Sequence, residues 1–196
     1  MAVYLRTHRR RAGLTLEALA ERTGSTKSYL SKVERGLSTP SIAVALKIAD
    51  ALNTDVGQLF SDTPDPALMQ VGRADEHAPD LSAPAADYHA LATKVVGKAM
   101  QPFLVRPAVG QPNADEGEDH LAHTGDEFIF VHSGAVEVTV PGEVITLRQG
   151  DSFYFAATTP HRIRSISPER AQLVVIVAER QPGAGGVAGS GIPGPR

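Results

Sequence analysis

The chain has 196 residues, 42% of them hydrophobic, which is enough for one or two domains with ordinary cores. It has no cysteine, so disulfides and thiolate chemistry are excluded and a reducing cytoplasm is the expected location. No apolar run is long enough for a signal peptide or a membrane span, so a soluble protein is expected. The net charge of -3 divides into +4 over residues 1–60 (nine basic, five acidic) and -7 over the rest (ten basic, seventeen acidic). A basic N-terminal part on an acidic body favours nucleic-acid contact at one end.

Helical periodicity extends over residues 1–60. The spacing predicts a first helix from Val3 to Arg11. A later helix follows Thr39-Pro40-Ser41, because a hydroxyl can cap its start and proline fits its first position. Asn53 can end this helix in the left-handed conformation. Asp55, followed three residues later by Gln58, predicts a capping box for a short fifth helix.

Residues 15–36 have the pattern of a helix-turn-helix. Thr15 and Thr26 each precede a short segment with helical apolar spacing, and each can cap it. The turn between the segments contains Gly24, which can adopt positive φ. Two short helices joined by such a turn form a helix-turn-helix. The outer side of the second helix carries side chains that can donate to phosphates and base edges: Lys27, Ser28, Tyr29, Ser31, Lys32 and Arg35.

Residues 5–60 resemble the Cro/phage-repressor-type (XRE) helix-turn-helix domain, a five-helix lambda-repressor-like fold. The spacing of the matching residues agrees with the family pattern throughout. Two residue types differ from it: Leu16, where many members have glutamine, and Ser25, where most have an apolar residue. The matching residues include Leu5, Arg9, Gly13, Thr15, Leu19, Gly24, Tyr29-Leu30-Ser31-Lys32, Val33-Glu34-Arg35-Gly36, Pro40, Leu46, Ala49, Leu52 and Leu59-Phe60.

The resemblance implies roles for individual residues. The residues expected to contact DNA are Thr15, Thr26, Lys27, Ser28, Tyr29, Ser31, Lys32 and Arg35. Lys27, Ser28 and Lys32 would face the major groove, where lysine can donate to guanine O6 and N7. Thr26, Ser31 and Arg35 would lie nearer the phosphates, which fix the register without reading sequence. Arg9 and Glu34 match the family's structural ion pair.

After residue 60 the apolar period changes from helical to two. Residues 61–66, SDTPDP, are predicted to be a linker, residues 110–120 an acidic loop centred on 115–119, and residues 180–196 a disordered Gly/Pro tail. Many short strands at close spacing indicate a sandwich or small barrel. The strand candidates are Leu68–Val71, Tyr88–Val96, Pro102–Val109, Phe128–Val131, Ala135–Val140, Glu143–Leu147, Ser152–Phe155, Arg162–Ile166 and Ala171–Val177.

Residues 67–179 resemble a single cupin (double-stranded β-helix) domain, so the expected fold is an α + β two-domain protein with a C-terminal all-β barrel. The first motif is carried by His123-Thr-Gly-Asp-Glu127 and Gly134, and the second by Gly150-Asp151 and Pro160-His161. In that family the positions of His123, Glu127 and His161 bind a divalent metal. Two imidazoles and one carboxylate are the ligand set of the non-haem iron facial triad.

The cupin motifs are incomplete. Leu121 replaces a fourth metal ligand, Ser165 a common asparagine, and Ala156 and Thr158 the usual proline and glycine. Three ligands are sufficient for iron, zinc, manganese or nickel, yet regulatory cupins with partial ligand sets also bind small molecules without metal. The sequence leaves both alternatives open.

The leading hypothesis is a sequence-specific DNA-binding transcriptional regulator with no catalytic residue. Its cupin domain would bind a small-molecule effector, with or without a metal, and dimerise. A twofold homodimer would place its recognition helices about one DNA turn apart, ~34 Å, on a near-palindromic operator.

The alternative is an enzyme. The domain order is also similar to hydroxypropylphosphonate epoxidase, a mononuclear non-haem iron oxygenase, in which His123, Glu127 and His161 would hold Fe(II). Its phosphonate substrate would need cations, for which Lys94, Lys98 and Arg106 are the candidates. A basic outer face on the recognition helix favours the regulator, because an enzyme does not need it. A helix-turn-helix used only for protein contact is the third reading.

Overall fold

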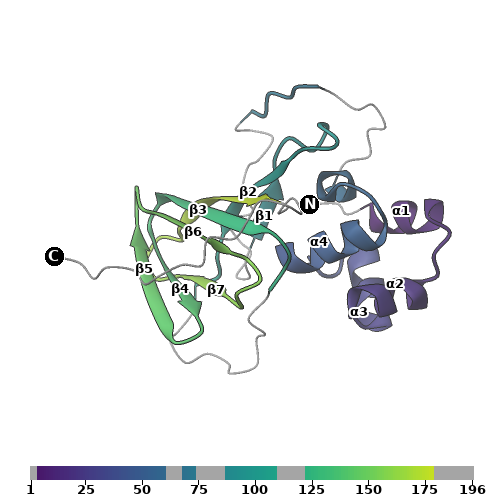
Figure 1. The fold of residues 1–196 in the computed structure, drawn as a ribbon, viewed down its shortest axis with the longest axis horizontal. Coiled ribbons are helices and arrows are strands. Elements are labelled where there is room, and N and C mark those ends of the chain that lie inside the picture. The colour runs from purple at the N-terminus through teal and green to yellow at the C-terminus, as the bar shows by residue number, and fades with distance from the viewer. Residues whose placement is uncertain (1–3, 61–67, 74–86, 110–121, 179–196) are drawn as a thin grey trace, which may run out of the picture.

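The computed structural model describes residues 4–60, 68–73, 87–109 and 122–178. The predicted linker, the acidic loop and the Gly/Pro tail lie outside these residues. Helices occupy one side of the molecule and strands the other (Figure 1). The helical side contains α1 (Leu5–Arg11), α2 (Leu16–Thr23), α3 (Lys27–Glu34), α4 (Ile42–Ala51) and the 3-10 helix η1 (Val56–Phe60). Within the described ranges, no helix is long and apolar enough to cross a membrane.

Side-chain caps define the starts of three helices. The hydroxyls of Thr15, Thr26 and Ser41 accept hydrogen bonds from the backbone N–H three residues later, at the starts of α2, α3 and α4. Gly24 ends α2 with a φ of 64°, and Asn53 follows α4 with a φ of 50°, the left-handed conformation predicted for it. The helices pack around a shared apolar core that includes Leu5, Leu19, Leu30, Val33, Ile48, Val56 and Leu59.

The fifth helix differs from the prediction. Four α-helices are present among the described residues, and the predicted fifth is the 3-10 helix η1. Asp55 does cap this turn, since its Oδ1 accepts from the Gly57 N–H at 2.8 Å. Gln58 does not complete a capping box, because its Nε2 donates to the carbonyl of Thr93 at 3.1 Å. A tertiary hydrogen bond to the strand side therefore replaces the local one.

The strand side consists of two antiparallel sheets. The five-stranded sheet has the order β1-β2-β8-β3-β6 and the three-stranded sheet the order β5-β4-β7. Alternate residues such as Ile129, Val175 and Val136 are buried, and they belong to the same apolar cluster as the core of the helical side. Within the described residues the sheets do not close into a barrel. The strands are β1 (Asp87–Ala90), β2 (Met100–Arg106), β3 (Asp126–Ser133), β4 (Ala135–Val140), β5 (Glu143–Arg148), β6 (Ser152–Ala156), β7 (Arg162–Ser165) and β8 (Gln172–Ala178).

Eight of the nine predicted strand segments overlap an observed strand, and the remaining segment is wrong. Leu68–Val71 is not a strand, and Leu68 and Met69 are 100% and 83% exposed. No strand among the described residues pairs with its backbone. The predicted strand from Tyr88 to Val96 is shorter than expected, because the chain turns after Ala90 and Ala92 has a φ of 51°.

The helical and strand sides contact each other directly. The Tyr88 ring on β1 packs edge-on against Phe60 of η1 and against Phe103 of β2, with ring centroids 5.9 and 5.8 Å away. Asp55, at the start of η1, forms an ion pair with Lys98, 3.0 Å between Oδ1 and Nζ. Both of these charged side chains are less than 8% exposed, so the contact between the two parts includes a buried ion pair.

Candidate functional site

Helix α3 has one buried and one exposed side. Leu30 and Val33 are fully buried against the other helices, whereas Lys27, Ser28 and Lys32 are exposed. Arg35, which follows the last turn, is also exposed. The apolar spacing of the sequence therefore orients α3 so that hydroxyl and basic side chains face solvent.

The other residues expected at this surface contribute less exposed area or act as caps. Thr15 and Thr26 are exposed, and their hydroxyls accept from Ala18 and Tyr29 N–H, each at 3.1 Å. Ser31 is half-buried. Tyr29 is also half-buried and packs against the core, and burial raises the pKa of its phenol. The Tyr29 side chain therefore packs partly against the core and is only partly available on the outer surface of α3.

An ion pair links the exposed sides of α2 and α3. Lys27 Nζ donates to Glu17 Oε1, and both side chains are about 60% exposed. This hydrogen bond lowers the pKa of Glu17. Because water screens such exposed pairs, they contribute little to stability, and Lys27 can exchange Glu17 for another anion.

Arg9 and Glu34 form a bidentate ion pair between α1 and the end of α3. Arg9 Nε lies 2.6 Å from Glu34 Oε1, and Nη2 lies 3.2 Å from Oε2. Arg9 Nη1 also donates to the carbonyl of Leu14 at 2.8 Å. The hydrogen bond to Glu34 raises the pKa of Arg9. The two side chains are 12% and 8% exposed, so the pair lies within the domain and away from the outer side of α3.

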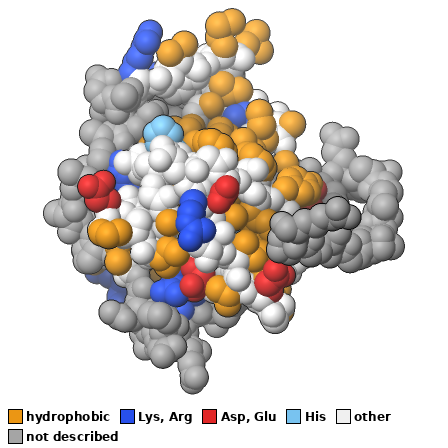
Figure 2. Space-filling model, turned by 90° about the vertical axis from the view of Figure 1, so that its left-hand side faces the viewer, with side chains coloured by type: hydrophobic (Ala, Val, Ile, Leu, Met, Phe, Trp, Pro, Cys, Tyr) orange, Lys and Arg blue, Asp and Glu red, His pale blue; other side chains and the backbone are white. Residues whose placement is uncertain are grey.

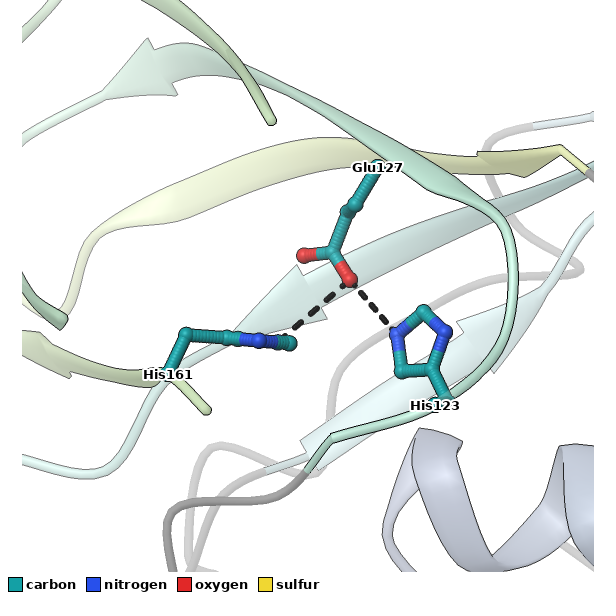
Figure 3. Close-up of side chains that lie close together, drawn as sticks. All are labelled: His123, Glu127 and His161. Carbon is teal, nitrogen blue, oxygen red and sulfur yellow. Dashed lines mark hydrogen bonds and ion pairs between the residues drawn. The ribbon is translucent and has the colours of Figure 1, made fainter. Parts of the chain in front are cut away.

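Three side chains of the strand side converge on one point (Figure 3). Glu127 extends from β3, His123 lies just before β3, and His161 just before β7. Glu127 Oε2 is 2.9 Å from His123 Nε2 and 3.5 Å from His161 Nε2. One ligand atom from each residue lies within 4.8 Å of the others. The three residues that the cupin resemblance selects are thus close enough to share a single ion.

Backbone carbonyls orient both imidazoles. His123 Nδ1 lies 3.0 Å from the carbonyl of Thr124, and His161 Nδ1 lies 2.9 Å from that of Thr159. A carbonyl can only accept, so each Nδ1 carries a proton and Nε2 is directed at Glu127. This is the arrangement of metal-binding histidines, whose other ring N–H usually donates to a carbonyl or carboxylate. When the proton is on Nδ1, Nε2 of a neutral imidazole is an acceptor, as is the Glu127 carboxylate. Such a contact is favourable only if a cation lies between the two acceptors or if Nε2 also carries a proton.

The charge of this cluster is mutually stabilised. Burial alone would raise the pKa of Glu127, but hydrogen bonds from His123 and His161 outweigh burial and keep it below its ordinary value. Burial alone would lower the pKa of His161, but the hydrogen bond and charge of Glu127 outweigh burial and raise it. The donor set, its geometry and its charge fit a divalent cation.

The incomplete parts of the cupin motif have other roles where they are described. Ser165 is fully buried, and its hydroxyl accepts from the Ala171 N–H at 3.0 Å, so it holds a loop in place. Of the cations considered for a phosphonate substrate, Lys98 is paired with Asp55, and Lys94 is exposed. Arg106 is buried and lies on the opposite face of β2 from Gln101.

Sequence reasoning missed the polar contact between the two parts. Asp55 Oδ2 accepts from Gln101 Nε2 at 3.0 Å, in addition to the bond between its Oδ1 and Lys98. The sequence identified Asp55 only as a cap, because no local pattern links it to residues more than 40 positions away. A polar residue with apolar neighbours on β2, such as Gln101, was the one available signal.

Comparison with known proteins gives two family matches. The helix-turn-helix family model matches residues 5–59, and the cupin domain model matches residues 109–177. Several relatives match over the first part alone. An uncharacterized HTH-type transcriptional regulator of Methanothermobacter thermautotrophicus is 42% identical over 55 residues, 28% of this chain and 80% of its own length. SlrR of Bacillus subtilis is 40% identical over 57 residues, 29% of this chain and only 38% of its own.

Other relatives match over both parts. The HTH-type transcriptional regulator SutR of Escherichia coli is 28% identical over 84% of this chain and 86% of its own. The crystal structure of an HTH_3 family transcriptional regulator from Vibrio cholerae aligns over 90% of this chain and 93% of its own, with a TM-score of 0.57 and 25% identity. Hydroxypropylphosphonic acid epoxidase aligns over 88% and 94%, at 22% identity and a TM-score of 0.45.

Proposed function

Since the chain belongs to the helix-turn-helix transcriptional regulators, with an XRE-type helix-turn-helix joined to a cupin domain, we propose that it binds a DNA operator and that an effector controls this binding. Residues 1–60 form the proposed DNA-binding domain and residues 67–179 the sensor and dimerisation domain. Residues 61–66 connect them, and residues 180–196 form a tail. The cytoplasm is the proposed location, because the operator is there.

The exposed side of α3 carries this proposal. Lys27, Ser28 and Lys32 are proposed to enter the major groove, because they are exposed on α3, Lys27 and Ser28 at its start and Lys32 in its last turn. Thr26, Ser31 and Arg35 are proposed to contact phosphates, and Thr15 at the start of α2 and Tyr29 to support them. Lys27 would exchange its ion pair with Glu17 for a DNA contact.

The proposed assembly is a homodimer formed by the cupin domain. Figure 2 shows hydrophobic side chains gathered on the face of the strand side that lies farthest from the helices. Exposed large apolar side chains of these strands include Phe130, Val144 and Tyr154. A twofold axis through this domain would present two α3 helices about 34 Å apart, as a near-palindromic operator requires. Light scattering of the purified protein tests the dimer.

The cupin domain is proposed to hold a divalent cation through His123, Glu127 and His161, with iron, zinc, manganese and nickel as candidates. Three protein ligands leave coordination positions for water or for an effector. When bound, the metal would supply a Lewis-acidic anchor for such a ligand. The protein would need two arrangements of its DNA-binding and cupin domains that differ in affinity for DNA. An effector changes DNA affinity only if it binds one of these arrangements more tightly than the other.

A pull-down of genomic fragments tests the DNA-binding function. The purified protein is incubated with sheared DNA at two salt concentrations, beside the variant Lys27→Ala/Lys32→Ala. Enrichment of one or a few near-palindromic sites, lost in the variant and weakened by salt, is the expected result. No enrichment over random DNA would contradict the regulator and favour the iron-enzyme alternative, which metal analysis and an oxygenase assay would then test.

A further inference from the structure

An open cavity of about 570 Å³ lies between the helical and strand sides. The helical side contributes Leu46 and the last turn of α4, residues 53–55 and Val56 at the start of η1. The strand side contributes residues 96–99, Gln101, Thr124 and Val177. The volume is within the range of small-molecule sites, about 300–1,000 Å³. A ligand here would touch both domains at once.

The cavity lies next to the histidine-glutamate cluster. Thr124, in its wall, follows His123 directly, and the Thr124 carbonyl orients the His123 ring. Val177, also in the wall, is the strand partner of both Glu127 and Gln101, so these three residues share one face of the sheet. A helix lies close to His123 in Figure 3, in agreement with the α4 residues of the wall.

The charges of the wall do not cancel. Asp55 is fully used, because its two oxygens accept from the Gly57 N–H, Lys98 and Gln101. Lys98 therefore neutralises Asp55. Asp50 is exposed to the cavity, and no hydrogen bond or ion pair of its carboxylate is found among the described residues. The wall has one carboxylate in excess.

The end of α4 adds to this negative potential. Asp50 lies in the last turn of α4, where a helix carries a partial negative charge at its carbonyl end. No basic residue of α4 itself lies in this turn, and Arg22 of α2, whose Nη1 donates to the Ala51 carbonyl at 3.3 Å, offsets only part of this charge. An acidic side chain at this end is unfavourable for the free helix, and a bound cation would relieve it.

We propose that this interdomain cavity is a binding site for a small organic cation, with Asp50 as the residue that pairs with its ammonium group. The aliphatic wall, formed by Leu46, Val96 and Val177 among others, accepts an apolar body. This site is separate from the coordination sphere of the histidine-glutamate cluster, because none of those three residues lines it.

Its regulatory consequence rests on the proposed DNA-binding function. A cation between Asp50 on α4 and the strand side would stabilise one orientation of the helix-turn-helix relative to the sensor domain. By linkage, DNA that selects the same orientation would tighten the binding of the cation, and DNA that selects another would weaken it.

The test uses three matched probes, 4-phenylbutylamine, 4-phenylbutanol and 4-phenylbutyrate. Their binding to the full chain is measured at neutral pH by ligand-observed NMR, with a chelator present so that the amine cannot coordinate a metal. The expected result is that only the amine binds, and that Asp50→Asn weakens it about threefold to fivefold, as loss of a partly screened ion pair predicts. Asp50→Asn should fold, because its side chain is exposed at a helix C-terminus.

Glu143→Gln is the matched control, since it removes one exposed carboxylate from β5, away from the cavity. It should bind the amine as the wild type does. Ala99→Phe, which fills part of the exposed wall, should also weaken the amine. Three results would overturn the proposal. They are no binding of the amine, equal binding of all three probes, and a loss of amine affinity in Glu143→Gln as large as that in Asp50→Asn. Because no DNA is present, failure here is distinguishable from failure of operator binding.

Discussion

The phenol of Tyr88 on β1 donates a hydrogen bond to the carbonyl oxygen of Pro40, 2.6 Å away, just before α4. The Tyr88 side chain is buried, and burial raises the pKa of its phenol, so it remains a neutral donor. Its ring is also inserted between Phe60 and Phe103. One side chain of the strand core therefore fixes the position at which α4 begins.

Tyr88→Phe should loosen the contact between the domains without disrupting the apolar packing around the ring. The ring contacts are retained, but the buried Pro40 carbonyl loses its partner, which costs about 1–3 kcal/mol. The expected result is a lower free energy of unfolding of the helical domain, measured by denaturant titration. Tyr29→Phe is the control, because its half-buried ring is kept and no hydrogen bond of its hydroxyl is found among the described residues, and it should change this free energy by less than about 0.5 kcal/mol. Equal effects would contradict the role of Tyr88.

Lys27→Ala/Lys32→Ala should weaken operator binding at least about tenfold and reduce the dependence of affinity on salt, because fewer counterions are released. Both side chains are exposed, so the fold should be preserved. Fluorescence anisotropy with labelled operator at several salt concentrations measures both effects. Lys47→Ala removes an exposed cation from α4 instead and should leave affinity within about twofold. A similar loss in Lys47→Ala would indicate non-specific attraction alone.

Glu34→Gln should destabilise the helical domain. It leaves Arg9, 12% exposed, without its bidentate partner, and breaking one side of a buried pair costs about 3–5 kcal/mol, less here because some water reaches it. Thermal unfolding by circular dichroism should show a transition several degrees lower. Glu21→Gln, at an exposed position on α2, should unfold like the wild type. An unchanged transition in Glu34→Gln would show that the pair contributes nothing net.

Local patterns predicted most of the fold. Helix starts follow from the hydroxyls of Thr15, Thr26 and Ser41, and strand positions follow from alternation that buries residues such as Ile129 and Val175. These features depend on neighbours a few residues away, and the sequence contains them directly. The motif spacing also grouped His123, Glu127 and His161, whose donor atoms lie close together.

Features set by distant partners were not predicted. Gln58 bonds to Thr93 in preference to the start of η1, and Asp55 pairs with Lys98, because the strand side packs against this turn. Leu68–Val71 is apolar, but no strand in the described part of the chain pairs with it. The cavity beside Asp50 is formed by two domains, so neither domain's sequence pattern contains it.

The histidine-glutamate cluster should give opposite pH dependences with and without metal. Without metal, the pKa of His161 is raised above its ordinary value of 6.5, so its pairing with Glu127 stabilises the fold fully below pH 6.5 as long as Glu127 remains ionised. That contribution is lost as pH rises through the folded-state pKa of His161. The pKa of Glu127 is lowered from 4.5, so its contribution is present above pH 4.5 and is lost only at lower pH.

Zinc binding requires a neutral His161, so its affinity should increase as pH rises through the same pKa. The shift in unfolding temperature on adding Zn²⁺ should therefore be small at pH 5.5 and several degrees at pH 8, because stabilisation follows the ratio of free metal to Kd. Differential scanning fluorimetry after chelation measures it. His161→Ala should abolish the shift at pH 8, whereas His132→Ala, an exposed histidine on β3, should retain it. A shift that persists in His161→Ala, or that is the same at both pH values, would place the zinc elsewhere.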